Sequence, residues 1–145
     1  MYWLPALSWL FAVALFSSGF FGASHTGWFL TNLLRLLHIQ LTAPSFYFLH
    51  YMIRKIAHFG AYGILSWLMF RAMKGSNGGI RNWKLLWAAL TLFICLMTSS
   101  ADEVHQAFTP GRTGTWKDVA LDMMGATFAQ LVLLLANPRR RTAKS

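Results

Sequence analysis

The sequence predicts an all-α integral membrane protein: a bundle of four transmembrane helices with an amphipathic helix between the first two. Three observations predict it. The chain is 56% hydrophobic and has a mean hydropathy of +0.44, which is typical of membrane proteins. Its long apolar runs approach the roughly 20 residues that a helix needs to cross a bilayer. All four carboxylates lie between positions 102 and 122. The 145 residues suit a single domain.

The first predicted span is an uncharged segment at about 3–22, rich in Leu, Phe and Ala. Its length suits a crossing of the hydrocarbon layer. No Lys or Arg precedes it, so the basic start of a cleaved signal peptide is missing. We therefore expect this segment to be a membrane helix.

The second predicted span covers about 52–73. Its uncharged centre, between Lys55 and Arg71, is short for a crossing. Long basic side chains at the edges of a span can reach back to the headgroups, and this lengthens the usable helix. The same sequence therefore suits a full crossing.

Between these spans, the segment 27–42 has a helical pattern with a narrow polar stripe. The polar residues recur at intervals of four, three and four positions: Thr31, Arg35, His38 and Thr42. Leucines occupy the opposite side, and Trp28 and Phe29 are residue types enriched at the headgroup boundary. We expect an amphipathic helix lying in the interface. The alternative is a fifth buried helix packed on the bundle.

The third and fourth predicted spans cover about 85–101 and 119–136. They are joined by a loop at 102–118 that contains a Pro-Gly turn signal. A basic tail follows at 139–145.

Four spans would place both termini and the loop between spans 2 and 3 on one side. Eight of the 13 Lys and Arg residues fall on that side, and five fall on the other side together with all four acids. The positive-inside rule then predicts cytoplasmic termini and an outward-facing acidic cluster. Because the basic residues flank the spans, the net charge of +9 does not indicate nucleic-acid binding.

Span 2 opens with ionisable residues that share one helical face. Lys55, His58 and Tyr62 are spaced i, i+3, i+7, and Arg54 lies near the same face. Ionisable groups inside a span usually point to the bundle interior or a wet cavity. The residues form either a functional site or a structural hydrogen-bond anchor. Small residues nearby are expected to allow close helix approach: Ala57, Gly60 and Ala61.

Span 3 ends in Asp102, Glu103 and Gln106. Neighbouring side chains on a helix diverge by about 100°, so Asp102 and Glu103 are not expected to form a close pair. We expect one to face a cavity and the other to cap a helix or meet lipid headgroups. The alternative is that both mark the water boundary.

Span 4 begins with Asp118 and Asp122, which stack on one face at i, i+4. Asp118 has an ordinary explanation, because an acid near a helix start is favoured by capping and the helix dipole. Asp122 lies one turn further in and costs about 2 kcal/mol without a partner. Its candidate partners are Arg54, Lys55, His58 and Arg112. Gly125, with Ala129, offers a close-packing face.

These residues predict one polar pocket at the outer ends of spans 2, 3 and 4. The catalytic candidates are His58, Glu103 and Asp122. The ligand-binding candidates are Arg54, Lys55, Tyr62, Asp102, Gln106, Arg112 and Asp118. No spacing matches a known catalytic or metal motif, and no cofactor is evident. A divalent metal held by His58 and carboxylates is the less favoured alternative.

Three blocks of this sequence resemble the VanZ-like family. They are Arg54-Lys55-x-x-His58-Phe59-x-x-Tyr62, Asp102-Glu103-x-x-Gln106-x-Phe108-x-Pro110-x-Arg112 and Asp118-x-x-x-Asp122-x-x-Gly125. A weaker likeness covers Ser17, Ser18 and Ser24. The blocks span about half of the chain in the family's order. The chain departs from the family at Asp122-Met123-Met124-Gly125, where the family often has Asn.

The resemblance implies a small multi-span protein of the bacterial cell membrane with a role in the cell envelope. The family's namesake is linked to low-level resistance to teicoplanin, a lipid-bearing glycopeptide antibiotic. We therefore expect an outward pocket that binds a lipid, a lipid-linked envelope precursor or a lipoglycopeptide. Alternatives are an intramembrane enzyme acting on a lipid phosphate or ester, a small proton-coupled transporter, and a structural bundle that acts through a partner. No sequence feature specifies an oligomer.

Overall fold

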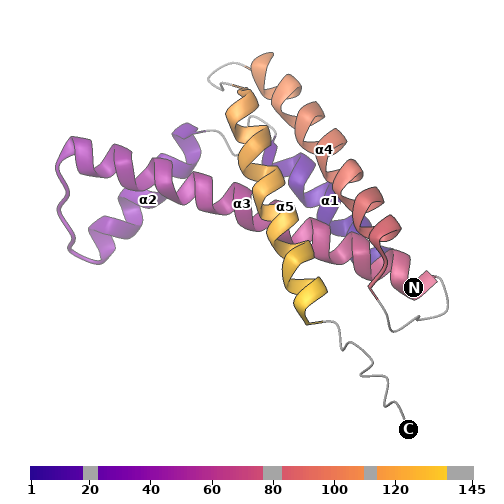
Figure 1. Cartoon of the computed structure of the whole chain (residues 1–145). Helices are drawn as coiled ribbons and strands as arrows, with labels where there is room; N and C mark the ends of the chain where they lie inside the picture. Colours follow the sequence, from indigo (N-terminus) through magenta and orange to yellow (C-terminus); the bar gives the residue numbers. More distant parts are fainter. Residues whose placement is uncertain (18–22, 77–82, 110–113, 137–145) are drawn as a thin grey trace, which may run out of the picture.

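The computed structural model describes residues 1–17, 23–76, 83–109 and 114–136. These parts contain helices only: α1 (Leu4–Ser17), α2 (Ala23–Leu36), α3 (Ala43–Ser76), α4 (Leu85–Ala107) and α5 (Trp116–Leu135). Helices α1, α4 and α5 gather around the second part of α3 (Figure 1). The predicted all-α class is confirmed.

Helices α4 and α5 are long and apolar enough to cross a membrane. Helix α1 is apolar but has 14 residues, and positions 18–22 of the predicted first span lie outside the described residues. Helix α3 has 34 residues and extends beyond the predicted span 52–73 at both ends. By length and composition, the described residues therefore support two of the four predicted spans.

The most extensive helix contact joins α3 to α5, which cross closely (Figure 1). Two glycines allow the helices to approach this closely. A methyl group on Gly125 would overlap the backbone carbonyl of Phe59, and one on Gly63 would lie 3.3 Å from the Gly125 carbonyl oxygen. The close-packing prediction for Gly125 is confirmed. The prediction for Gly60 is wrong, because a methyl group added there would have no neighbour within 4 Å outside its own helix backbone.

Buried polar groups also hold α3 against α5. The Ser66 hydroxyl donates to the Ala126 carbonyl at 2.9 Å, and the Gln130 amide donates to Ser66 Oγ at 2.9 Å. Ser66, Ala126 and Gln130 are all buried. In an apolar surrounding, unpaired polar groups are costly, so these bonds favour one register of the two helices.

Helix α1 rests on the bundle through its inner face. The indole nitrogen of Trp9 donates to the Ala61 carbonyl of α3 at 2.9 Å. Ala6 and Val13 are buried in the same apolar core as Tyr62 and Leu65 of α3. This packing brings the end of α1 close to the region that contains the acidic residues.

Helix α2 spans Ala23–Leu36, whereas the amphipathic helix was predicted at 27–42. Both predicted ends therefore lie too far along the chain. His38 takes a left-handed conformation, with φ of 57°. The Ile39 amide donates back to the Leu34 carbonyl, the bond expected of a left-handed cap that stops a helix. The next helix starts at Ala43, and its second residue is Pro44, a residue favoured in the first turn.

Helix α2 and the start of α3 project away from the bundle (Figure 1). Thr26 Oγ1 lies 2.9 Å from His50 Nε2, which links the two helices. Burial and the nearby Arg54 charge lower the pKa of His50, so its ring is neutral at pH 7. Trp28 and Phe29 remain 71% and 64% exposed, which leaves an apolar surface outside the bundle.

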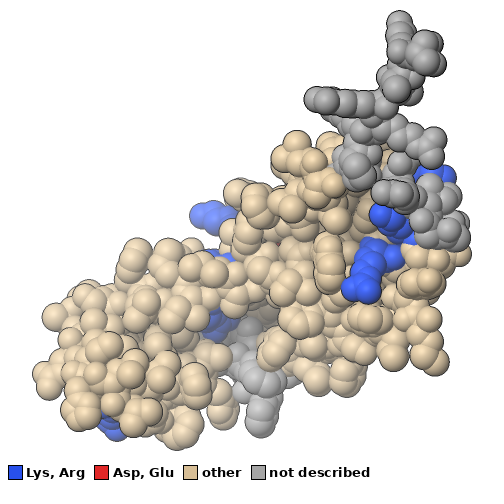
Figure 2. Space-filling model, turned by 90° about the horizontal axis from the view of Figure 1, so that it is seen from below, with Lys and Arg blue, Asp and Glu red and all other residues tan. Residues whose placement is uncertain are grey.

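The acidic residues are turned inward. Glu103 and Asp122 are buried, and Asp102 and Asp118 are half-buried. Figure 2 shows one face of the molecule, on which basic side chains are visible and no acidic side chain appears. The carboxylates are therefore not a solvating patch of the surface.

Candidate functional site

Two polar contacts join α3 to α5 next to their close crossing. Lys55 Nζ pairs with Asp118 Oδ1, and His58 Nδ1 lies 3.2 Å from Asp122 Oδ1. Thus Lys55 and His58, spaced i, i+3 on α3, face Asp118 and Asp122, spaced i, i+4 on α5. The predicted stacking of Asp118 and Asp122 on one face is confirmed.

Asp122 is completely buried and uses both carboxylate oxygens. Oδ1 faces His58, and Oδ2 accepts a 2.6 Å hydrogen bond from the Ser99 hydroxyl of α4. A buried carboxylate needs charge or hydrogen-bond partners, and these two residues supply them. Of the partners considered from the sequence, His58 contacts Asp122, whereas Lys55 pairs with Asp118 instead.

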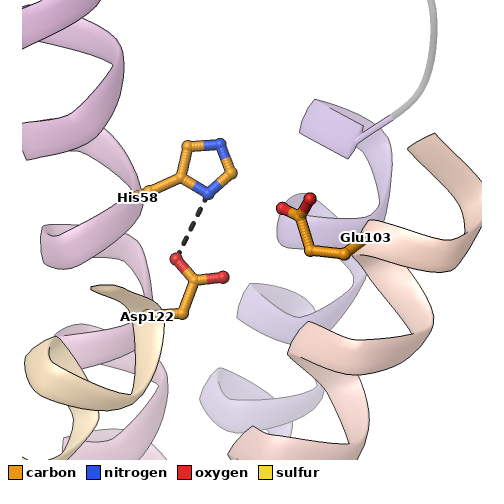
Figure 3. A group of neighbouring side chains, drawn as sticks. All are labelled: His58, Glu103 and Asp122. Carbon is orange, nitrogen blue, oxygen red and sulfur yellow. Dashed lines mark hydrogen bonds and ion pairs between the residues drawn. The ribbon is translucent and has the colours of Figure 1, made fainter. Parts of the chain in front are cut away.

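Glu103 is the second buried carboxylate, at 5% exposure. Its Oε2 accepts a 2.7 Å hydrogen bond from the Thr115 backbone amide. Its Oε1 is buried and has no hydrogen-bond partner among the described residues. Figure 3 shows Glu103 of α4 facing the space next to His58 of α3 and Asp122 of α5. One possible ligand atom from each residue lies within 4.8 Å of the other two, so these three side chains could hold a metal.

Asp102 occupies the other inward face of α4. Its Oδ2 accepts a 3.0 Å hydrogen bond from the Gln106 amide, which also lies 3.5 Å from Ser17 Oγ of α1. As predicted, one of the two acids faces a cavity: Asp102 lies beside α1 and α3 and lines the cavity described below. Glu103 points to another side of α4, where it is buried and binds the backbone amide of Thr115, the N-cap residue of α5. Both side chains therefore face inward, and the alternative that both mark the water boundary does not hold for Glu103.

Gly114 and Thr115, the two described residues just before α5, lie directly against α4. A methyl group on Gly114 would overlap the backbone carbonyl of Glu103, so only glycine fits at this approach. The close approach places the Thr115 amide on the Glu103 carboxylate. The Gly114 backbone thus positions the Thr115 amide, and this amide orients the Glu103 carboxylate.

A cavity of about 460 Å³ lies between α1, α3 and α4. Most of its wall surface is apolar, although seven of the lining residues are polar or ionisable. The apolar lining residues include Trp9, Val13, Phe16, Ala57, Ala61 and Ile64. The polar lining residues are Ser17, Thr26, Arg54, His58, Tyr62, Asp102 and Gln106. His58 belongs both to this lining and to the contact with Asp122.

The structure brings most predicted site residues together. Arg54, His58, Tyr62, Asp102 and Gln106 line one cavity, and Glu103 and Asp122 lie behind His58. Lys55 and Asp118 form the neighbouring ion pair. Arg112 lies outside the described residues.

Sequence reasoning missed three groups that hold the site. Ser99 binds Asp122, the Thr115 amide binds Glu103, and Ser17 lies beside Gln106. Ser99 lies three residues before Asp102, at the polar end of α4, and that position was its available signal. The backbone amide of Thr115 has no sequence signal.

Comparison with known proteins decides the family. The sequence profile described as VanZ/LLP1 matches residues 2–137. The chain belongs to the VanZ/LLP1 family. The match covers all five helices and every acidic residue of the chain. Searches of curated proteins and of solved structures gave no match.

The VanZ/LLP1 match extends the resemblance of three sequence blocks to nearly the whole chain. Membership, together with the two apolar helices, supports a membrane protein with a role in the cell envelope. The described residues of the three blocks converge in space: the first block lies on α3, the third lies on α5, and Asp102, Glu103 and Gln106 of the second lie at the end of α4.

Proposed function

We propose that this chain binds an amphiphile of the bacterial cell envelope in the cavity between α1, α3 and α4. The ligand is a lipid, a lipid-linked envelope precursor or a lipoglycopeptide of the teicoplanin type. The observation that carries the proposal is the lining of the cavity, which combines apolar walls with charged and hydrogen-bonding groups. Such pockets bind ligands by burying apolar surface while a few polar groups set orientation.

The volume suits part of a lipid. About 460 Å³ lies within the usual range of small-molecule sites. Acyl or prenyl carbon would lie along Val13, Ala57 and Ile64, where each buried methylene contributes about 0.8 kcal/mol. Gly60 also lines the cavity, and the absence of a side chain there keeps it open.

The polar groups suit an anionic headgroup. Arg54 lines the cavity and offers a guanidinium that can bind phosphate or carboxylate with two hydrogen bonds. His58 adds a titratable ring, and Asp102 with Gln106 adds acceptors and donors for sugar or amide groups. Phosphate linked to sugar or peptide is the chemistry common to lipid-linked envelope precursors.

We further propose four membrane crossings, with cytoplasmic termini and the cavity facing outward in a bacterial plasma membrane. The excess of basic residues on the side of the termini supports this orientation. Helix α2 would lie in the outer interface, because it projects from the bundle and exposes Trp28 and Phe29. A ligand could then enter the cavity sideways from the outer leaflet.

A second candidate function is hydrolysis or transfer at a lipid phosphate or ester. The observation that favours it is the contact of His58 with the buried Asp122, while the same His58 lines the cavity. A carboxylate that orients a histidine is a common arrangement for general acid–base catalysis. New lipid species in mass spectra after incubation with lipid extracts, absent with His58→Gln, would favour this function over binding alone.

The cellular role is tested by antibiotic susceptibility. Matched membrane levels of wild type, Gly60→Ala and Gly60→Leu are expressed in a susceptible Gram-positive host. We expect protection against teicoplanin and little against vancomycin, which has no lipid chain. Gly60→Leu should lose the protection because its side chain fills the cavity, whereas Gly60→Ala should keep most of it. Equal protection by all three chains would separate the cavity from resistance.

A further inference from the structure

We propose that His58, Glu103 and Asp122 form a binding site for one divalent transition-metal ion. One possible ligand atom from each residue lies within 4.8 Å of the other two. The residues come from α3, α4 and α5, and they face one another across a small space (Figure 3). One imidazole and two carboxylates are a donor set that Zn²⁺ and Mn²⁺ accept.

The buried negative charge of the cluster favours the binding of a cation. Glu103 and Asp122 are 5% and 0% exposed, so two carboxylates are withdrawn from water at one place. Within the described residues, His58 is the partner of Asp122, Glu103 has no ion-pair partner, and Lys55 is paired with Asp118. A divalent ion with a neutral imidazole would balance both carboxylates, whereas a protonated histidine would balance one.

An independent observation points to a ligand at this place. Glu103 Oε1 is buried and has no hydrogen-bond partner among the described residues. Its carboxylate faces His58 and Asp122 (Figure 3). Buried polar atoms nearly always have a partner in a folded protein, and a bound cation would provide one for this oxygen.

The carboxylates are held as metal ligands usually are. Ser99 donates to Asp122 Oδ2, and the Thr115 amide donates to Glu103 Oε2. Each acid thus has one oxygen fixed by a hydrogen bond from outside the cluster. The other oxygen of Asp122 faces His58, and the other oxygen of Glu103 has no hydrogen-bond partner among the described residues. Such outer hydrogen bonds orient metal ligands.

The spacing fits after a small contraction. Ligand atoms at about 2.0–2.1 Å from a tetrahedral Zn²⁺ lie about 3.3 Å apart. The distance from His58 Nδ1 to Asp122 Oδ1 is already 3.2 Å. The ligand atoms, which lie within 4.8 Å of one another, would have to approach by up to about 1.5 Å to reach this spacing. Three protein ligands leave a fourth position open, as in zinc sites that bind a substrate or water.

The site is tested on the untagged full-length chain in detergent, without added lipid. The protein is stripped with a chelator, and Zn²⁺, Mn²⁺ and Ca²⁺ are titrated separately by calorimetry. We expect one Zn²⁺ or Mn²⁺ per chain and much weaker binding of Ca²⁺. Glu103→Gln and Asp122→Asn should each weaken binding at least tenfold. Asp118→Asn is the matched control, because Asp118 lies one turn from Asp122 but outside the cluster, and it should bind as wild type does.

X-ray absorption of the zinc-loaded wild type gives a second readout that needs no variant. We expect a first shell of nitrogen and oxygen with one imidazole. Two or more imidazoles, or sulfur, would place the ion elsewhere in the chain and overturn the proposal. Absence of stoichiometric binding, or equal weakening by Asp118→Asn, would overturn it as well. Because the readout is metal stoichiometry and coordination and no lipid is added, these results do not depend on the proposed lipid-binding function.

Discussion

Replacing Asp122 with alanine is expected to destabilise the protein by about 3 kcal/mol. The substitution removes the only carboxylate partner of His58 among the described residues and leaves the Ser99 hydroxyl without its acceptor. Both interactions are lost at Asp122, whose side chain has no exposure to solvent. Removing one member of a buried polar pair costs more than the pair itself contributes, because the remaining group stays buried without its partner.

Unfolding in detergent, followed by circular dichroism, measures this effect. Asp118→Ala is the control: its pair with Lys55 is partly exposed, so its loss should cost about 1 kcal/mol. Asp122→Asn keeps the shape and a hydrogen-bond acceptor for Ser99, and it should therefore fold much better than Asp122→Ala. If Asp122→Ala and Asp118→Ala cost the same, Asp122 is not the central polar anchor of the bundle.

Gly125→Ala is expected to separate α3 from α5 and to cost about 1–3 kcal/mol. The added methyl group would overlap the Phe59 carbonyl, which belongs to a helix backbone and cannot rotate away. Gly125 lies three residues after Asp122 on the same face of α5. The separation should therefore also lengthen the distance from His58 to Asp122 and weaken any ligand that depends on this contact.

Gly60→Ala is the matched control for Gly125→Ala, because it adds the same methyl group to the partner helix where nothing lies within 4 Å. It should be neutral or stabilising by up to about 1 kcal/mol, the helix-propensity gain of alanine over glycine. Gly63→Ala should fall between the two, since its methyl group would meet the Gly125 carbonyl oxygen at 3.3 Å. Thermal unfolding of all three variants in one detergent ranks them. Equal stability of Gly125→Ala and Gly60→Ala would contradict the close crossing.

The all-helical architecture could be predicted because apolar runs without charges have few alternatives in a membrane. The i, i+4 spacing of Asp118 and Asp122 correctly placed both side chains on one face of α5. The same spacing could not say which residue of α3 meets which acid. That pairing depends on the register of α3 and α5, which Gly63 and Gly125 set through their close approach.

The inward position of both Asp102 and Glu103 could not be predicted from α4 alone. Helical geometry correctly says that their side chains diverge, but it does not say how many sides of the helix are covered. Helices α1 and α3 lie beside Asp102, and Gly114 and Thr115 lie beside Glu103. The end of α2 was missed for a local reason, because His38 is a residue type that only sometimes takes a left-handed conformation.

Direct binding is the test of whether the cavity between α1, α3 and α4 holds an amphiphile. Wild type, Gly60→Ala and Gly60→Leu are purified in the same detergent, and bound lipids are measured by native mass spectrometry after exposure to a lipid-linked envelope precursor. We expect one bound amphiphile per chain for wild type and Gly60→Ala, and at least a tenfold loss for Gly60→Leu, whose fold should be intact because the space around Gly60 is open. Equal binding by a folded Gly60→Leu would contradict the claim, because the ligand would then lie outside this cavity.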